Sequence, residues 1–190
     1  KKIAGPNWLI LLECCDTDLT KSLKVANCLA PVHPVSHIQL SDSAYPSRWR
    51  GLRGAPAQVA VQGKVAALQA TTTVAIVGSR AASTASMTSA QGLAEGLAQR
   101  GTMVVSGGAL GIDGAAHRGA IGHTVVVLGS GIAHWYPTRH VDLFNDVVTQ
   151  GGAVISTFED EATPLRSYFV SRNRLIAALA DVVVVVEAQP

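Results

Sequence analysis

Arginine and aromatic residues gather in one short segment near the end of the sequence. Arg166, Arg172 and Arg174 lie within nine residues, together with Tyr168 and Phe169. A guanidinium binds a phosphate through paired hydrogen bonds, and an aromatic ring offers a face on which a nucleobase stacks. The segment therefore predicts a nucleic-acid site. An amphipathic helix whose arginines pair with nearby carboxylates would have the same composition, so this alternative stays open.

Two glycine-containing turns could supply the rest of such a site. Gly78-Ser79-Arg80 follows an apolar run, and Ser106-Gly107-Gly108 opens a segment with three glycines in five positions. Glycine allows close approach of a ligand, and a helix that follows such a turn points its N–H groups at an anion. Neither turn matches the Walker or GxGxxG nucleotide motifs. The turns indicate phosphate binding, although a tight turn with a surface arginine would look the same.

Asp113 and His117 are spaced for an acid–base pair on one side of a helix. No nucleophile is identifiable beside them, so we favour a capping carboxylate and a hydrogen-bonded histidine. We also expect Trp135 and Tyr136 to pack beneath the site. The sequence therefore predicts no catalysis and no cofactor. It also predicts no metal site, because the three cysteines, at positions 14, 15 and 28, lack a CxxC spacing and are expected to be reduced thiols.

The order of apolar runs predicts an α/β fold. We expect strands at 74–77, 103–105, 125–128, 154–155 and 182–186, and helices at about 84–100, 112–120, 139–149 and 171–180. Strands that are apolar throughout are typical of a buried parallel sheet. The pattern predicts a Rossmann-like parallel sheet with helices on both faces. Ligands of such sheets bind outside the carboxyl ends of the strands, where the turns and the arginine segment should meet.

The composition fits one packed domain with a local basic site. Hydrophobic residues make up 48% and charged residues 15%, and the net charge is only +2, so any basic site must come from clustering. We assign 1–39 to an N-terminal extension of uncertain role and 40–190 to the Rossmann-like domain. With no signal peptide evident and the aliphatic run 182–186 too short to span a bilayer, we expect a cytoplasmic protein without a membrane partner.

Four motifs, in this order, resemble the DNA-processing protein A family (DprA, also called Smf). They are a GSR turn at 78–80, an SGxAxGID segment at 106–113, a VLGxGxxxxYP segment at 127–137 and an FPxRNRIIA segment at 169–177. The first three match at every fixed position, whereas in the fourth Val170 replaces the proline and Leu175 replaces the first isoleucine. Each motif is modest alone, but their order and spacing together are specific.

The resemblance implies a single-stranded DNA-binding protein of DNA processing, natural transformation (competence) and recombination. It implies a RecA-type recombinase as a partner that is loaded onto the strand, and a homodimer. The family continues beyond Pro190, so we expect a domain truncated at its C-terminal end. The DNA-binding residues predicted from the turns and the resemblance are Gly78, Ser79, Arg80, Ser106, Gly107, Gly108, Arg139, Arg166, Phe169, Arg172, Asn173 and Arg174.

Two other functions remain open at this point. Phosphoribohydrolases of the same superfamily carry PGGxGTxxE, whereas the segment 106–113 has no glutamate after it. A nucleotide-binding sensor would use the same cleft for a small ligand. The DNA hypothesis depends on one geometric prediction, which is that Arg80, Arg166 and Arg172 converge around a single glycine-lined hollow.

Overall fold

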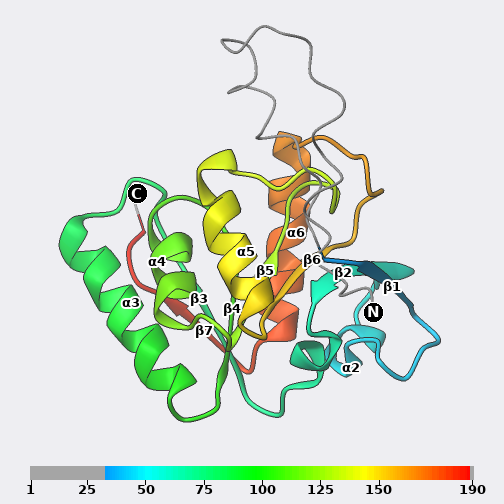
Figure 1. The fold of residues 1–190 in the computed structure, drawn as a ribbon, viewed down its shortest axis with the longest axis horizontal. Helices are drawn as coiled ribbons and strands as arrows, with labels where there is room; N and C mark the ends of the chain where they lie inside the picture. Colours follow the sequence, from blue (N-terminus) through cyan, green and yellow to red (C-terminus); the bar gives the residue numbers. More distant parts are fainter. Residues whose placement is uncertain (1–32, 189–190) are drawn as a thin grey trace, which may run out of the picture. The chain divides into compact units, whose positions relative to one another are not determined.

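A seven-stranded sheet forms the centre of residues 33–188, the part of the chain that the computed structural model describes (Figure 1). The sheet order is β1-β2-β6-β5-β4-β3-β7. Neighbours from β6 to β7 pair in parallel, whereas β1 and β2 are antiparallel additions at one edge. The strands are β1 (Val35–Gln39), β2 (Gln58–Gly63), β3 (Thr73–Val77), β4 (Met103–Ser106), β5 (Thr124–Val127), β6 (Ala153–Ser156) and β7 (Val182–Val185).

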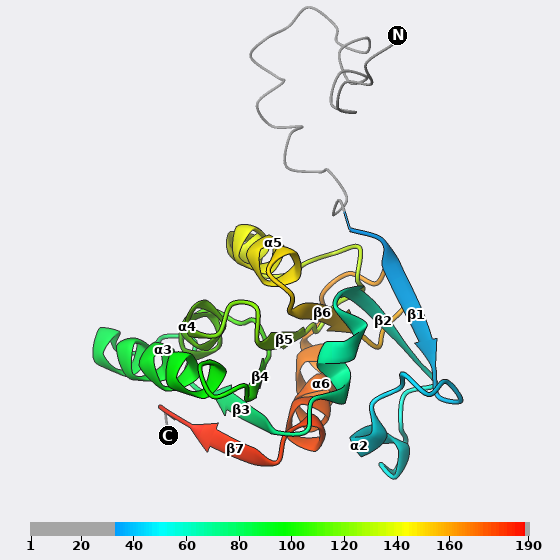
Figure 2. The same cartoon turned by 60° about the horizontal axis from the view of Figure 1, so that its bottom comes forward.

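Helices cover both faces of this sheet, as the sequence predicts (Figure 2). Helices α3 (Thr84–Ala98), α4 (Ile112–Gly119) and α5 (Val141–Thr149) lie on one face. On the other face lies α6 (Arg166–Leu179), together with the short helix α2 (Ser47–Arg50) and the 3₁₀ turn η3 (Val65–Gln69). A second 3₁₀ turn, η4 (Thr138–His140), precedes α5. The predicted Rossmann-like α/β architecture is confirmed.

Two predicted boundaries differ from the structure. The sheet already begins at Val35, because β1 pairs with β2, so part of the assigned N-terminal extension belongs to the sheet. Helix α6 begins at Arg166 rather than at position 171. Most of its first turn is exposed, so this turn lacks the apolar spacing by which the helix was recognised in the sequence. Residues 1–32, including the three cysteines, lie outside the described residues.

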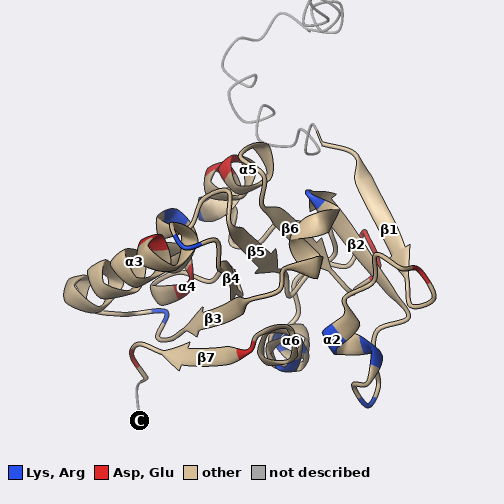
Figure 3. Ribbon diagram, turned by 90° about the horizontal axis from the view of Figure 1, so that it is seen from below, with Lys and Arg blue, Asp and Glu red and all other residues tan. Residues whose placement is uncertain are grey.

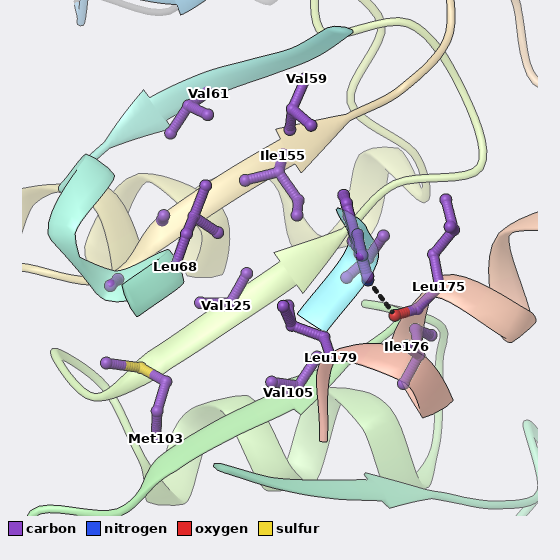
Figure 4. Close-up of a cluster of buried hydrophobic side chains, with 14 of the residues drawn as sticks. Val59, Val61, Leu68, Met103, Val105, Val125, Ile155, Leu175, Ile176 and Leu179 are labelled. Atoms are coloured by element: carbon purple, nitrogen blue, oxygen red, sulfur yellow. Dashed lines mark hydrogen bonds between the residues drawn. The ribbon is translucent and has the colours of Figure 1, made fainter. Parts of the chain in front are cut away.

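The central strands are buried on both sides because successive side chains alternate between two hydrophobic layers. Val125 and Val127 of β5 face the α6 layer, whereas Val126 packs with α5. Figure 4 shows the α6 layer, where the side chains of α6 meet those of the strands. There the indole N–H of Trp49 donates to the carbonyl of Leu175 at 3.1 Å, which ties α2 to α6.

Capping residues and glycines fix where the helices begin and end. The Ser83 hydroxyl accepts from the backbone N–H of Ser86 at 3.2 Å and caps α3. Gly101 and Gly151 follow α3 and α5 with φ of +76° and +104°, a conformation that favours glycine. Because the strands from β6 to β7 run parallel, the loops that follow them lie at the same edge of the sheet, its carboxyl edge. Within residues 33–188, no helix is long and apolar enough to cross a membrane.

Candidate nucleic-acid interface

Arg80 and Phe169 meet at the carboxyl edge of the sheet. Arg80 lies in the turn after β3, and its guanidinium carbon is 5.4 Å from the centre of the Phe169 ring on α6. This distance suits a cation–π interaction. Arg80 is exposed, and within residues 33–188 it forms no ion pair. Its guanidinium therefore has hydrogen-bond donors available for an anion.

A small hollow of about 70 Å³ opens beside this pair. It is lined by Arg80, Gly107, Ala109, Leu110, Tyr136, Pro137 and Phe169. The Tyr136 ring lies 5.6 Å from the Phe169 ring and is 45% exposed. Our expectation of packing is therefore right for Trp135, which is buried against Phe144, and wrong for Tyr136. The position of Tyr136 after a strand of the parallel sheet was the available signal.

Glycine in the loop after β5 lets the Phe169 ring lie close to the backbone. A Cβ atom on Gly129 would be 2.5 Å from Cδ1 of Phe169 and 2.8 Å from Cε1. Any larger residue would have to displace the ring. Gly129 thus leaves room for Phe169, while Tyr136 and Arg80 also lie against the ring.

Arg172 belongs to the interior of the site. Its side chain is 3% exposed, and Nη1 donates to the carbonyl of Gly107 at 2.6 Å and to that of Val127. Its guanidinium carbon also lies 6.0 Å from the centre of the Phe169 ring. These hydrogen bonds join the ends of β4 and β5, so Arg172 has a structural role, and its direct contact with DNA stays a prediction.

The buried guanidinium still contributes positive charge to the site. Burial lowers the pKa of Arg172 to about 10, and the nearby carboxylate of Asp113 opposes this shift. Arg172 is therefore charged at neutral pH, beneath the exposed Arg80. The charge of Arg80 also lowers the pKa of Arg172, and a bound anion would be stabilised by both guanidiniums.

The glycine turn after β4 binds an internal carboxylate instead of an external anion. Oδ2 of Asp113 accepts from the N–H of Gly107 at 3.1 Å and from that of Ala109 at 3.3 Å. Burial raises the pKa of Asp113, while the Arg172 charge and these hydrogen bonds lower it. The N–H groups that were predicted to bind a phosphate are thus already bonded to the Asp113 carboxylate. Ser106 and Gly108 are also buried, so their predicted contact with DNA is corrected as well.

His117 does not pair with Asp113. Its Nδ1 lies 2.8 Å from the hydroxyl of Thr124 inside the fold, and its ring is fully buried. Burial, with the nearby His140 and two arginines, lowers the pKa of His117 to about 3. The imidazole is therefore neutral. These contacts support the structural role that the sequence favoured for both residues.

A second hollow of about 210 Å³ lies on the other side of Arg80. Arg80, Asp113, Arg172 and Asn173 supply its polar lining. Gly78 and apolar residues of β3, α6 and β7 supply the remaining walls. Arg80 therefore stands between two openings, and Asn173 faces only the second.

Four further predicted residues line neither hollow. Arg139 in η4 and Arg166 at the start of α6 are exposed, but neither lines a hollow. Arg174 donates to the carbonyls of Arg53 and Gly54, at 2.9 and 2.7 Å. The backbone N–H of Ser79 donates to the carbonyl of Glu187 at 2.7 Å. The predicted convergence thus holds for Arg80 and Arg172, and Arg166 is not part of either hollow.

Comparison with known proteins confirms the family resemblance. The sequence profile of DNA recombination-mediator protein A matches residues 36–190. The chain belongs to this family. Protein Smf of Escherichia coli strain K12 is 37% identical over 172 residues, which cover 88% of this chain and 46% of that protein. DNA processing protein DprA of Streptococcus pneumoniae is 35% identical over 78% of this chain and 52% of its own length.

Two solved structures of DprA proteins share the fold. The Helicobacter pylori protein, whose structure was described for its single-stranded DNA binding mode, has a TM-score of 0.78 and 29% identity. That similarity covers 85% of this chain and 73% of the Helicobacter chain. Streptococcus pneumoniae DprA has a TM-score of 0.71 and 32% identity, over 81% of this chain and 54% of its own. The chain spans about half the length of the curated DprA and Smf relatives described above.

Proposed function

We propose that this domain binds single-stranded DNA. The proposal depends mainly on Arg80, whose exposed guanidinium lies over the Phe169 ring. Arg80 forms no ion pair within residues 33–188. A backbone phosphate binds Arg80, and a base stacks on the half-buried Phe169 and the neighbouring Tyr136. The similarity to the Helicobacter protein, which was described for single-stranded DNA binding, supports this proposal.

The size of the hollows favours a polymer over a small nucleotide. Their volumes, about 70 and 210 Å³, are below the roughly 300–1,000 Å³ of typical small-molecule sites. A strand needs only a shallow surface with a charge and a ring, because its affinity adds up over several nucleotides. Stacking and phosphate contacts accept any base, so the expected binding has no sequence preference.

Hydrolysis of a nucleotide fits the site less well. Asp113 accepts hydrogen bonds from its own loop, and His117 is bonded to Thr124 inside the fold. His117 lines neither hollow, and Asp113, although it lines the second hollow, already accepts two hydrogen bonds from its own loop. The residues that would serve as acid and base in a phosphoribohydrolase-like enzyme are therefore used for folding.

The wider biological role is inferred from the family. Family membership supports a role in DNA processing during natural transformation and recombination. The RecA-type recombinase partner and the homodimer stay predictions, as do the residue-level DNA contacts. Since the chain spans about half of its curated relatives, these activities are proposed for the whole protein to which such a domain belongs.

Titration of labelled oligo-dT at several salt concentrations tests the proposal. We expect affinity to fall with salt, with a slope of about −0.7 in log K against log salt for each phosphate bound. A nucleoside monophosphate should compete poorly with the oligonucleotide. Tight binding of the monophosphate with a flat salt dependence, and no oligonucleotide binding, would instead identify a nucleotide sensor.

A further inference from the structure

Two exposed arginines with an exposed valine between them form a row along the solvent-facing side of α6. Arg166, Val170 and Arg174 are four residues apart, so their side chains follow one another along the same helix face. All three are exposed, and Val170 is 70% exposed. The row spans about 12 Å of helix axis at 1.5 Å per residue. The row begins about one turn before Phe169 on the same helix.

Arg174 connects this row to the loop that follows α2. Its guanidinium donates to the carbonyls of Arg53 and Gly54, which fixes the loop against α6. Carbonyl partners leave the charge of Arg174 uncompensated. The Arg53 side chain is exposed and forms no hydrogen bond or ion pair in the described part of the chain. In Figure 3, several of the basic positions lie on α2, on the loop after it and on α6.

Arg48, in the same region, differs from these arginines because its charge is paired within the fold. It pairs with Asp181 at 2.6 Å and donates to the carbonyls of Ala70 and Thr71. Its charge is neutralised within the fold. By contrast, no carboxylate in residues 33–188 pairs with Arg53, Arg166 or Arg174. These three charges are left for a partner, and the partner must be anionic.

We propose that Arg166, Val170 and Arg174, together with Arg53, form a strip that binds the phosphates of the same DNA strand beyond the Arg80–Phe169 site. This inference rests on the proposed function and extends its footprint. The exposed Val170 lies between Arg166 and Arg174 in the row, so the strand crosses it from one cation to the next. The strip explains why Arg166 and Arg174 are exposed although neither lines a hollow.

Oligonucleotide length separates the two parts of the interface. Oligo-dT of about 4 nucleotides should occupy only the Arg80–Phe169 site, whereas about 16 nucleotides should also cover the strip, within the range of known single-strand sites. The test variants are Arg53→Gln, which removes a charge without a folding contact, and Val170→Glu, which adds a negative charge at the middle of the strip. Lys64→Gln is the control, because Lys64 is exposed at the opposite edge of the sheet.

We expect Arg53→Gln to weaken binding of the long oligonucleotide about fivefold at about 0.1 M salt. This is the affinity that one phosphate contact contributes there if log K falls by about 0.7 per tenfold rise in salt. Val170→Glu should weaken it at least as much, and both variants should bind the short oligonucleotide like the unmodified protein. Unchanged binding of the long oligonucleotide by both variants would overturn the strip. If the unmodified protein bound neither oligonucleotide, the proposed function itself would fail.

Discussion

The guanidinium carbon of Arg80 lies 5.4 Å from the centre of the Phe169 ring, and that of Arg172 lies 6.0 Å from the same ring. The two arginines have different roles. Arg172 is buried and bonded to carbonyls of β5 and of the loop after β4, whereas Arg80 is exposed. The ring is thus held by the fold while an available charge lies beside it. This arrangement favours simultaneous binding of a base and its phosphate.

Replacing Phe169 with leucine should weaken DNA binding by roughly 1–3 kcal/mol, because the stacking face is lost. The slope of affinity against salt should stay the same, since no phosphate contact changes. Binding of labelled oligo-dT at several salt concentrations measures both quantities. Phe158→Leu is the control, because that ring stacks on Tyr168 and lines neither hollow. Equal losses in the two variants would argue against a special role for Phe169.

Gly129→Ala should reduce DNA binding more than it reduces stability. The new Cβ would lie 2.5 Å from Cδ1 of Phe169, so the ring must move from its position. Since Phe169 is only half-buried, it can move outward, and we expect about tenfold weaker binding, or about 1.4 kcal/mol. Gly92→Ala in α3 is the control, because nothing lies within 4 Å of its Cβ. That variant should bind normally and gain up to about 1 kcal/mol in stability.

Arg172→Met should destabilise the fold by about 1–3 kcal/mol, the usual cost of leaving a buried hydrogen-bonding group without its partner. It leaves Asp113 without its nearby positive charge and the carbonyls of Gly107 and Val127 without this donor. Urea unfolding measures the change. Adding Asp113→Asn should restore part of the lost stability, because no uncompensated carboxylate remains. A double variant whose losses simply add would show that the two charges do not interact.

Acidification should destabilise the fold through His117. Its pKa is about 3 in the fold and 6.5 in the unfolded chain, so between these values only the unfolded chain binds the proton. Stability is therefore lost as pH falls from 6.5, by up to about 1.4 kcal/mol per pH unit. His117→Asn can keep a bond to Thr124 but cannot take up a proton. Urea unfolding at about pH 7 and about pH 4.5 should show a smaller loss in the variant; equal losses would contradict the assignment.

The sequence predicts the parallel part of the sheet well because its strands are apolar throughout, including the edge strand β7, which is largely exposed. The run 125–127, for example, is apolar throughout and becomes β5. Strand β1 was not predicted, because most of it is exposed and its place depends on pairing with β2. Such pairing between distant segments leaves little trace in a local pattern. The Arg80 turn was predicted from its place between a strand and a helix.

Arg172 could have been assigned correctly from helix periodicity. It shares a face with Leu175, Ile176 and Leu179, which are spaced as i+3, i+4 and i+7 and are buried. A charged residue on that face is a candidate for an internal role. The interior binding of Asp113 by the glycine turn is harder to predict, since a carboxylate and an external phosphate suit the same N–H groups.

The salt dependence of oligo-dT binding by Arg80→Gln tests the central claim most directly. The account predicts weaker binding and a slope that is shallower by about 0.7, because one phosphate contact is lost. Lys64→Gln removes a charge at the opposite sheet edge and should leave both quantities unchanged. If Arg80→Gln bound the strand with the affinity and slope of the unmodified protein, the proposed site would be wrong.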